Sequence, residues 1–166
     1  NTDSNGNYVS NAISGVSGKS IALESFETSF HQDLNGDGTI GVVGTTIESS
    51  GSTSLVQVGN SYGLFTGGSG PSLKYGGTEF TAGQFGCVVV GAEAVGSGYQ
   101  VVLKVAGADT YAVWNTDSNG NYVSNAISGV SGKSIALESF ETSFHQDLNG
   151  DGTIGVVAHQ NDFHLL

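Results

Sequence analysis

The chain has 166 residues, enough for one domain or for one and a half small ones. Its 15 Asp and Glu residues against 4 Lys and no Arg give a formal net charge of −11. This charge argues against binding nucleic acid or anionic membranes, which need basic surface patches, and no run of about 18 apolar residues is present to span a membrane.

The composition also indicates many turns. Apolar residues make up 37% of the chain, enough for a core, and the 27 glycines indicate short strands rather than long helices. Acidic, Arg-free, Gly- and Ser-rich chains are common among secreted bacterial surface proteins. The first residues, NTDSNGNYVS, do not form a signal peptide, so we expect either an excised fragment or an export signal elsewhere.

The chain contains a long internal repeat. Asn1–Val43 and Asn115–Val157 are identical over all 43 residues at an offset of 114, and Gly44–Trp114 occurs once. We interpret 1–43 as the end of one repeat, 44–157 as a complete 114-residue repeat and 158–166 as a tail. A period of this length indicates a string of domains rather than a solenoid.

The segment between the two copies is predicted to be β. Two apolar runs flank Gly59-Asn60, which is a hairpin signal, and Cys87 lies in the apolar run FGCVVVG as a small core residue of a buried strand. Further strands of an antiparallel meander are predicted at Tyr99–Val105, Thr110–Asn115 and Tyr122–Ser124.

A helix is predicted after the last strand, beginning after Ser134 as N-cap and stopping at Asn149-Gly150. Its apolar residues fall at helical spacing: Leu137, Phe140, Phe144 and Leu148. Glu138 and Glu141 are expected among the polar residues between them. The predicted fold class is mainly β (α+β): a sandwich-like antiparallel meander with one amphipathic helix per repeat, leading into a calcium-type loop.

That loop has the oxygen spacing of an EF-hand. Calcium takes about six to eight oxygen ligands, which the EF-hand supplies from fixed loop positions. The matching side chains are Asp33, Asn35 and Asp37, followed by a turn glycine, Gly38, and by the backbone carbonyl of Thr39. In the second copy the corresponding residues are Asp147, Asn149, Asp151 and Thr153.

The loop lacks the acid at position 12, where Gly44 and Ala158 stand, and a strand rather than an exiting helix is expected after it. Glu48 and Asp162, each 15 residues past its loop's first Asp, are candidates to complete the shell. With two formal charges per loop we predict weak affinity, roughly 10⁻⁴–10⁻³ M. The alternative is an Asx-rich turn without an ion.

The remaining polar motifs give weaker indications of function. DSNGNY, at Asp3 and again at Asp117, reads as a hairpin turn, with a metal site as the alternative. His31 and His145 are expected to be capping or surface residues. Because no catalytic motif is present, the chain is not expected to be an enzyme.

Four stretches together resemble one known family: GSTSLVQVGNSYGLF, GPSLKYGGTEFTAGQFG, TYAVWNTDSNGNYVSN and VSGKSIALESFETSFHQDLNGDGTIG. They resemble the tryptophan-rich Synechocystis species C-terminal domain. The resemblance implies tandem domains in large secreted or surface bacterial proteins, often with haemolysin-type calcium-binding repeats, and export by a type I route. It implies no biochemical activity, and only Trp114 remains of the family's tryptophans.

Two functions follow as hypotheses. In the first, the chain is a calcium-binding spacer of an adhesin-type array at the bacterial surface, whose partners are neighbouring repeats. In the second, calcium assists binding of a glycan or a host or cell-surface protein through exposed aromatic residues, with Tyr62, Tyr75, Tyr99 and Phe80 as candidates. The partial copy is expected either to borrow a strand edge or to stay loose, with its helix on the complete repeat.

Overall fold

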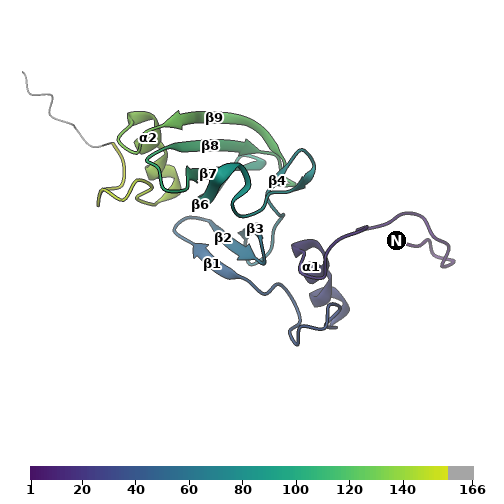
Figure 1. Cartoon of the computed structure of the whole chain (residues 1–166). Helices are drawn as coiled ribbons and strands as arrows, with labels where there is room; N and C mark the ends of the chain where they lie inside the picture. Colours follow the sequence, from purple (N-terminus) through teal and green to yellow (C-terminus); the bar gives the residue numbers. More distant parts are fainter. Residues whose placement is uncertain (157–166) are drawn as a thin grey trace, which may run out of the picture.

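The computed structural model describes residues 1–156. The chain is mainly β, with antiparallel sheets and two helices (Figure 1). The first sheet contains β1 (Thr45–Glu48), β2 (Thr53–Val58) and β3 (Ser61–Thr66). The second contains β6 (Cys87–Val95), β7 (Gly98–Val105), β8 (Tyr111–Thr116) and β9 (Tyr122–Val130). Between them lie a small hairpin of β4 (Lys74–Tyr75) and β5 (Thr78–Glu79) and a 3-10 turn, η1 (Gln84–Gly86).

The predicted hairpin and meander are confirmed. β2 and β3 pair from Val58 opposite Ser61, and Gly59 makes their turn with a φ of 57° that favours glycine. β7 and β8 match the predicted strands, while β9 continues past Ser124 to Val130. The sequence did not predict this extension because its glycine, Gly129, is disfavoured in strands; pairing with β8 stabilises it.

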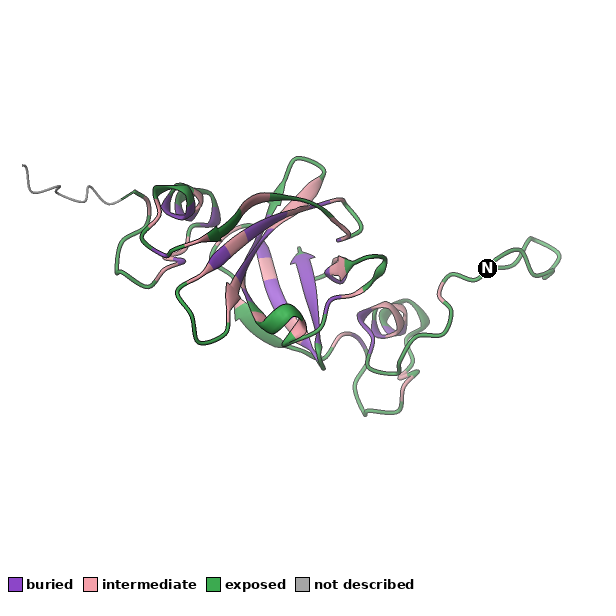
Figure 2. Ribbon diagram, turned by 45° about the horizontal axis from the view of Figure 1, so that its top comes forward, coloured by how far each residue is buried: buried purple, intermediate pink, exposed green. Residues whose placement is uncertain are grey.

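The two sheets face each other around one core, and each carries a helix on its other face. The core between the sheets includes Leu55, Leu64, Phe80, Val101 and Trp114. The far face of the second sheet packs on α2 (Ile135–Phe144), and the far face of the first packs on α1 (Ile21–Phe30). Figure 2 shows the buried strands at the centre of this arrangement, with a helix at either end.

The second helix, α2, is shorter than the sequence predicts. Ser134 is the N-cap, as expected, and its hydroxyl accepts a hydrogen bond from the amide of Ala136. The helix ends at Phe144, where His145 takes up a left-handed conformation, rather than at Asn149-Gly150. The amides beyond it turn back to donate to a buried glutamate of the helix itself, and this ends the helical hydrogen-bond pattern.

The strand expected directly after the loop begins later. Residues 39–44 are irregular, and β1 starts only at Thr45. The reason is that the amides of Gly41 and Val43 donate to the carboxylates of Glu27 and Glu24, which leaves them unable to pair with a neighbouring strand.

The partial copy divides into an exposed part and a part that packs on the sheets. Residues 1–10 form an exposed turn closed by a single bridge between Thr2 and Tyr8, and they extend away from the sheets (Figure 1). The helix of this copy, α1, packs on the complete repeat, as expected, with Ile21 against Val56 and Phe65. No helix within residues 1–156 is long and apolar enough to cross a membrane.

Candidate functional site

Each acidic loop leaves its helix through a left-handed residue. His31 and His145 close α1 and α2 with a φ of 53°, and their amides donate to the carbonyls of Glu27 and Glu141. Both histidines are exposed. They are helix caps, as predicted, and the two loops start in the same geometry.

The loop side chains gather on one turn. The amides of Gly36 and Gly38 donate to the two carboxylate oxygens of Asp33 at 2.6 and 2.8 Å. The amide of Asp37 donates to Asn35 Oδ1 at 2.8 Å, and the Asn35 side-chain amide donates to Asp37 Oδ2 at 3.1 Å. The structure therefore brings together the three side chains that the oxygen spacing selected.

The second loop repeats the first. Gly150 and Gly152 donate to Asp147 at 2.7 Å each, and Asn149 and Asp151 are linked as in the first copy. Gly152 has a φ of 90°, as the predicted sharp turn requires.

The carboxylate of Asp33 is held in its charged form. Hydrogen bonds from backbone amides, that of Gly38 foremost, lower the pKa of Asp33 below its ordinary value. The loop amides thus favour an anionic oxygen cluster at the surface, and an anionic oxygen cluster suits a hard cation.

Buried glutamates hold each loop from the inside, which the sequence analysis missed. Glu27 and Glu141 are fully buried. Glu141 Oε1 accepts from the amides of Leu148 and Asn149 at 3.0 and 3.4 Å, and its Oε2 accepts from Gly155 at 2.9 Å. Glu27 makes the same contacts in the first copy, so each carboxylate gathers amides from both ends of its loop.

The expectation that Glu138 and Glu141 lie on the polar side of the helix is wrong, because both are fully buried. A signal was present in the sequence: Glu141 lies four residues after Leu137 and three before Phe144, in the apolar stripe itself. A carboxylate at such a position is tolerated only when polar groups satisfy it, and the loop amides do so.

Glu24 makes a further link between helix and loop. Its Oε2 accepts from the amide of Val43 at 3.0 Å. Burial, chiefly, together with repulsion from Asp37 and Glu27, raises the pKa of Glu24 above its ordinary value. Carboxyl groups therefore lie on the inner side of the loop as well as on the outer side.

The proposed completing ligands are not brought to the loops by the described residues. Glu48 lies on β1, where its two carboxylate oxygens accept from Ala92 and Ser50 at 3.1 and 3.0 Å. Asp162 and the tail 158–166 lie outside the described residues. Within residues 1–156 no group of three or more His, Cys, Asp or Glu side chains is arranged to hold a metal ion.

The donor chemistry of each loop nevertheless fits calcium. Each loop offers two carboxylates and one amide oxygen, all hard ligands, on a turn that is already formed. A calcium ion there would take its remaining oxygens from backbone carbonyls, with Thr39 and Thr153 as the predicted donors, and from water.

The DSNGNY motif is a hairpin turn, as predicted. It joins β8 to β9, and Asp117 Oδ1 accepts from the amides of Asn119 and Asn121 at 2.9 Å each. The side-chain hydrogen bond from Asn121 is the main reason that the pKa of Asp117 is lowered. The Asp117 carboxylate thus stabilises the hairpin turn by accepting its backbone amides.

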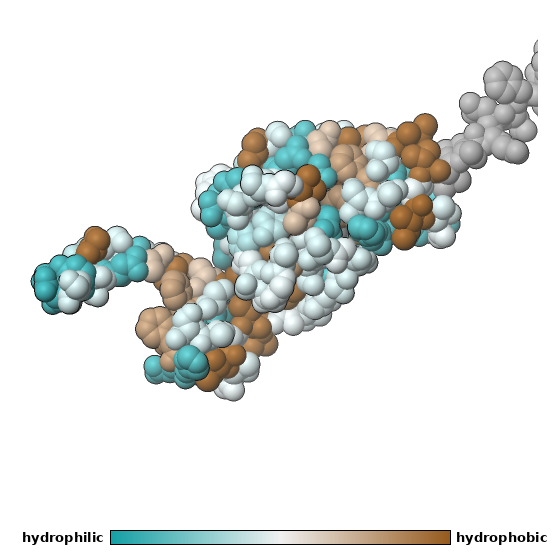
Figure 3. Space-filling view, turned by 180° about the vertical axis from the view of Figure 1, so that it is seen from behind, coloured by the Kyte–Doolittle hydropathy of each residue, from teal (hydrophilic) through white to brown (hydrophobic). Residues whose placement is uncertain are grey.

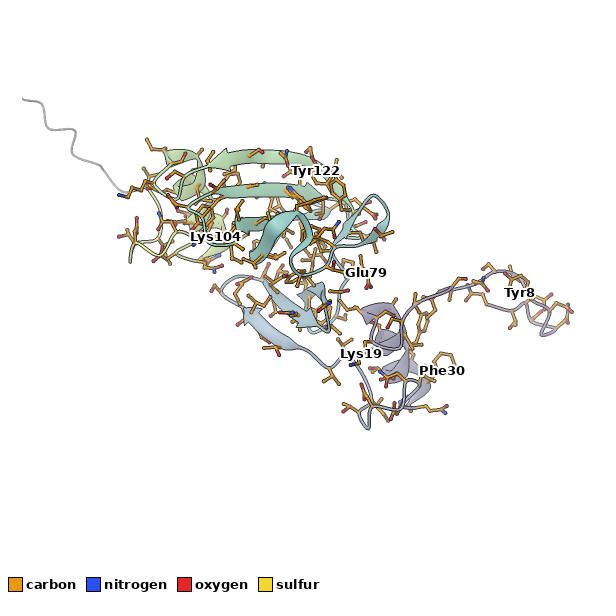
Figure 4. The ribbon with its side chains drawn as sticks, viewed as in Figure 1. Tyr8, Lys19, Phe30, Glu79, Lys104 and Tyr122 are labelled. Atoms are coloured by element: carbon orange, nitrogen blue, oxygen red, sulfur yellow. The ribbon has the colours of Figure 1, made fainter. Side chains whose placement is uncertain are left out.

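A second candidate site is an aromatic pocket on the other side of the second sheet. Trp114 contacts Tyr122 edge-on at a ring distance of 4.9 Å, and Tyr75 lies 5.1 Å from both Phe85 and Tyr122. Together with Asn125 and Ser128 these four aromatic residues line a shallow pocket of 310 Å³. Figure 4 shows Tyr122 at the outer edge of the sheet.

Only one of the aromatic residues selected from the sequence lines this pocket. Tyr62 and Phe80 are buried in the core, whereas Tyr75 is 38% exposed. Phe85 was missed: it is 60% exposed and has a φ of 57°, a strained conformation for a bulky residue. Cys87, two residues later, is half-buried at the start of β6 and packs against the edge of the core.

The model of one family, the tryptophan-rich Synechocystis species C-terminal domain, matches residues 53–155, which is more than half of the chain. The chain belongs to this family. No curated protein and no solved structure matches it.

The match places both candidate sites within the tryptophan-rich domain. It includes the second loop, from Asp147 to Thr153, and the aromatic pocket around Trp114, the only tryptophan of the chain. The first loop, from Asp33 to Thr39, precedes the matched residues. In this tryptophan-rich domain, therefore, the strands from β2 to β9, α2 and one complete loop belong to a single family unit, whereas β1 precedes the matched residues.

Proposed function

We propose that the chain is a non-catalytic structural repeat module of a large secreted or surface bacterial protein, and that its two acidic loops bind calcium. The observation that carries the proposal is the helix–loop corner formed in both copies. There Asp33, Asn35 and Asp37, and equally Asp147, Asn149 and Asp151, lie on one turn whose amides are held by a buried glutamate.

Two features of the corner favour a cation. The turn is already formed by hydrogen bonds to Asp147 and Glu141, so binding requires little ordering of the loop. The helix and loop also carry several carboxylates in a chain of net charge −11, and a divalent cation would relieve their repulsion.

The affinity we propose is weak. Two carboxylates per loop correspond to a dissociation constant of roughly 10⁻⁴–10⁻³ M, suited to extracellular calcium. At a calcium concentration of about ten times that constant, each site would stabilise the fold by about 1.4 kcal/mol. The β core would then supply most of the stability, and calcium would make the helix–loop corners rigid.

Thermal unfolding in calcium and in chelator tests the proposal. We expect calcium to raise the midpoint of the wild type, and the Asp33→Ala/Asp147→Ala double variant to lose this shift. Asp3→Ala is the matched control, because Asp3 also closes an exposed turn with its carboxylate but lies outside the loops. Equal midpoints of the wild type in calcium and chelator would rule out the calcium sites.

The secreted or surface location is part of the same proposal and rests on composition and on the family resemblance. Protease treatment of intact source cells tests it, with antibody detection of the repeat. Loss of the signal without lysis is the expected result, and full protection until lysis would contradict the location.

The aromatic pocket favours a second candidate function, the binding of a neutral glycan. The described lining contains aromatic faces and two polar side chains, Asn125 and Ser128, and no charged group. Sugar rings bind such sites by stacking on aromatic faces and by hydrogen bonding to a few polar groups. The exposure of Tyr75 and Phe85 provides the stacking surface.

A glycan array with the full chain tests this second function. Binding that Tyr75→Ala or Phe85→Ala abolishes would support it. Tyr8→Ala is the control, since Tyr8 is an exposed tyrosine on the N-terminal arm, remote from the pocket (Figure 4). Absence of binding to every glycan would leave the structural repeat as the function.

A further inference from the structure

One nine-residue sequence adopts two conformations in this chain. Tyr122–Val130 is β9, paired with β8 from Thr116 opposite Tyr122 to Tyr111 opposite Val130. The identical residues Tyr8–Val16 form no described strand and are almost entirely exposed. Because the two sequences are the same, the difference lies in the surroundings: Gly44–Trp114, which contains residues 111–114 of β8, precedes the second copy and not the first.

The helix that follows buries a different face in each copy. In the second copy, Leu137 and Phe144 of α2 and Leu148 of its loop are buried against Val102, Tyr111 and Val113 of the second sheet. Their counterparts on α1 and its loop are uncovered: Phe30 is 64% exposed and Leu34 is 38% exposed.

On the opposite face of the helix, the side chain is buried in α1 and exposed in α2. Ile21 of α1 is only 2% exposed, because it packs on Val56, Val58 and Phe65 of the first sheet. Its counterpart Ile135 on α2 is 63% exposed. The helix therefore has two apolar faces, and each copy in this chain has only one of them covered.

The uncovered face of α1 forms a docking surface with the arm before it. A hollow of 580 Å³ there is lined mainly by apolar side chains: Tyr8, Ile13, Leu23, Phe26, Phe30 and Leu34. Figure 3 shows hydrophobic atoms between the arm and α1, and Figure 4 shows Phe30 pointing away from the sheets.

We propose that this surface binds a further copy of the Gly44–Trp114 segment. The copy's last strand, equivalent to β8, pairs with Tyr8–Val16, and its sheet covers Leu23, Phe30 and Leu34 as the second sheet covers α2. By the same rule, the Ile135 face of α2 binds the first sheet of a following repeat. Each helix is then shared by two consecutive repeats and fixes their relative orientation.

The second copy of the repeated sequence identifies the occupant. The residues that cover Leu137, Phe144 and Leu148 belong to β7 and β8, and all of them, Val102, Tyr111 and Val113, lie within Gly44–Trp114. A second molecule of this chain fits the surface poorly, because its own sheet is already occupied by β9 and α2. The inference rests on the repeat-array part of the proposed function and does not depend on calcium.

The test is a fusion protein in which an extra copy of Gly44–Trp114 precedes Asn1 of the full chain. Val9→Ile marks the first copy, so that its peptides differ in mass from those of the second. This substitution is mild, because Val9 is 61% exposed and its counterpart Val123 is 62% exposed. Hydrogen exchange of the marked residues 8–16 is then compared with that of residues 122–130, in calcium and in chelator.

In the marked 166-residue chain we expect residues 8–16 to exchange about 100-fold faster than residues 122–130. In the fusion protein we expect both segments to exchange at similar rates, in calcium and in chelator alike. Fast exchange of residues 8–16 in a fusion protein whose added strands are protected would overturn the inference. Protection that needs calcium would show instead that the loops, not the added sheet, order this segment.

A second measurement does not depend on folding of the fusion protein. Sedimentation of the 166-residue chain at rising concentration is expected to show a monomer with residues 8–16 still exchanging fast. A dimer in which these residues become protected would overturn the inference, because a second molecule would then be the occupant.

Two matched variants test which face of each helix is covered. Ile21→Ser is expected to release α1 from the first sheet and to speed hydrogen exchange of α1 about 100-fold, whereas Ile135→Ser is expected to leave exchange of α2 unchanged. Equal effects of the two substitutions on their helices would contradict the two-faced helix.

Discussion

At the scale of single residues, the important groups are buried carboxylates rather than the exposed ones of the loop. Glu141 satisfies three backbone amides of the segment that follows its helix, and Glu27 does the same in the first copy. A buried charge is costly unless hydrogen bonds compensate it, and here those bonds also determine the path of the loop. The path of each loop is thus determined by a buried glutamate of the helix that precedes it.

We predict that Glu141→Gln lowers the free energy of unfolding by about 1–3 kcal/mol. The amide group of Gln can replace one carboxylate oxygen but places an N–H opposite the amide of Gly155 or of Leu148. Denaturant unfolding measures the change. Glu27→Gln is the matched control: it loosens the first loop but leaves unfolding of the β sheets nearly unchanged. A Glu141→Gln variant as stable as the wild type would contradict the bracing role.

The pH dependence of stability also belongs to single residues. Hydrogen bonds lower the pKa of Asp33, Asp109 and Asp117. The unfolded chain therefore binds more protons than the folded chain near the ordinary Asp pKa of about 3.9, and the stabilisation is lost as the pH falls through and below that value. Burial raises the pKa of Glu24 and Glu48, so that stability falls as the pH rises above their ordinary pKa of about 4.3.

We therefore predict a stability maximum in calcium-free buffer at mildly acidic pH, between about 4 and 5. Thermal midpoints measured from pH 3 to 8 locate it. Glu24→Gln is expected to flatten the decline on the alkaline side, because it removes a titrating group. A midpoint that rises steadily from pH 5 to 8 would show that Glu24 and Glu48 do not control the decline in stability on the alkaline side.

At the scale of elements, the same helix sequence contributes differently in its two positions. α2 is part of the folded unit because its apolar stripe covers the second sheet, whereas α1 is held mainly by Ile21 on the first sheet. The amphipathic pattern alone marks both stripes as apolar, but the amount of sheet available determines which stripe is buried.

We predict that Phe144→Ala destabilises the fold by about 3–5 kcal/mol, because Phe144 is 1% exposed in the core under α2. Phe30→Ala, the same change in the same sequence, is expected to alter stability by less than about 0.5 kcal/mol, because Phe30 is 64% exposed. Equilibrium denaturation of the two variants measures the difference. Similar losses would mean that α1 is covered in solution.

At the scale of the whole molecule, stability depends on the packing of the layers and on the net charge. Two sheets are packed face to face with a helix on each outer side, and the chain carries a net charge of −11. Such a charge opposes compactness through self-repulsion, which salt screens over a Debye length of about 10 Å at 0.1 M.

We predict that sodium chloride between about 0.02 and 0.5 M raises the thermal midpoint in chelator, because it screens this repulsion. At matched ionic strength, millimolar calcium is expected to raise the midpoint further if its effect is site-specific. Magnesium is the control, since it prefers a compact octahedral shell and retains its waters. Equal shifts with all three salts would reduce the calcium effect to screening.

The sequence by itself determined the features that depend on neighbouring residues. These were the 43-residue repeat, the hairpin at Gly59-Asn60, the strands of the meander, the Ser134 cap and the spacing that places Asp147, Asn149 and Asp151 on one turn. Each rests on backbone propensities and on contacts within a few residues along the chain, and these are written in local sequence.

Only the tertiary structure decided what the repeated residues do. Tyr8–Val16 and Tyr122–Val130 are identical, yet one is exposed and the other is a strand, and Ile21 and Ile135 are identical positions with opposite burial. No reading of a segment alone can separate two equal sequences. The difference comes from the strand edge and the sheet face that stand beside each copy, and both are supplied by Gly44–Trp114, which is distant in sequence from most of the residues it covers.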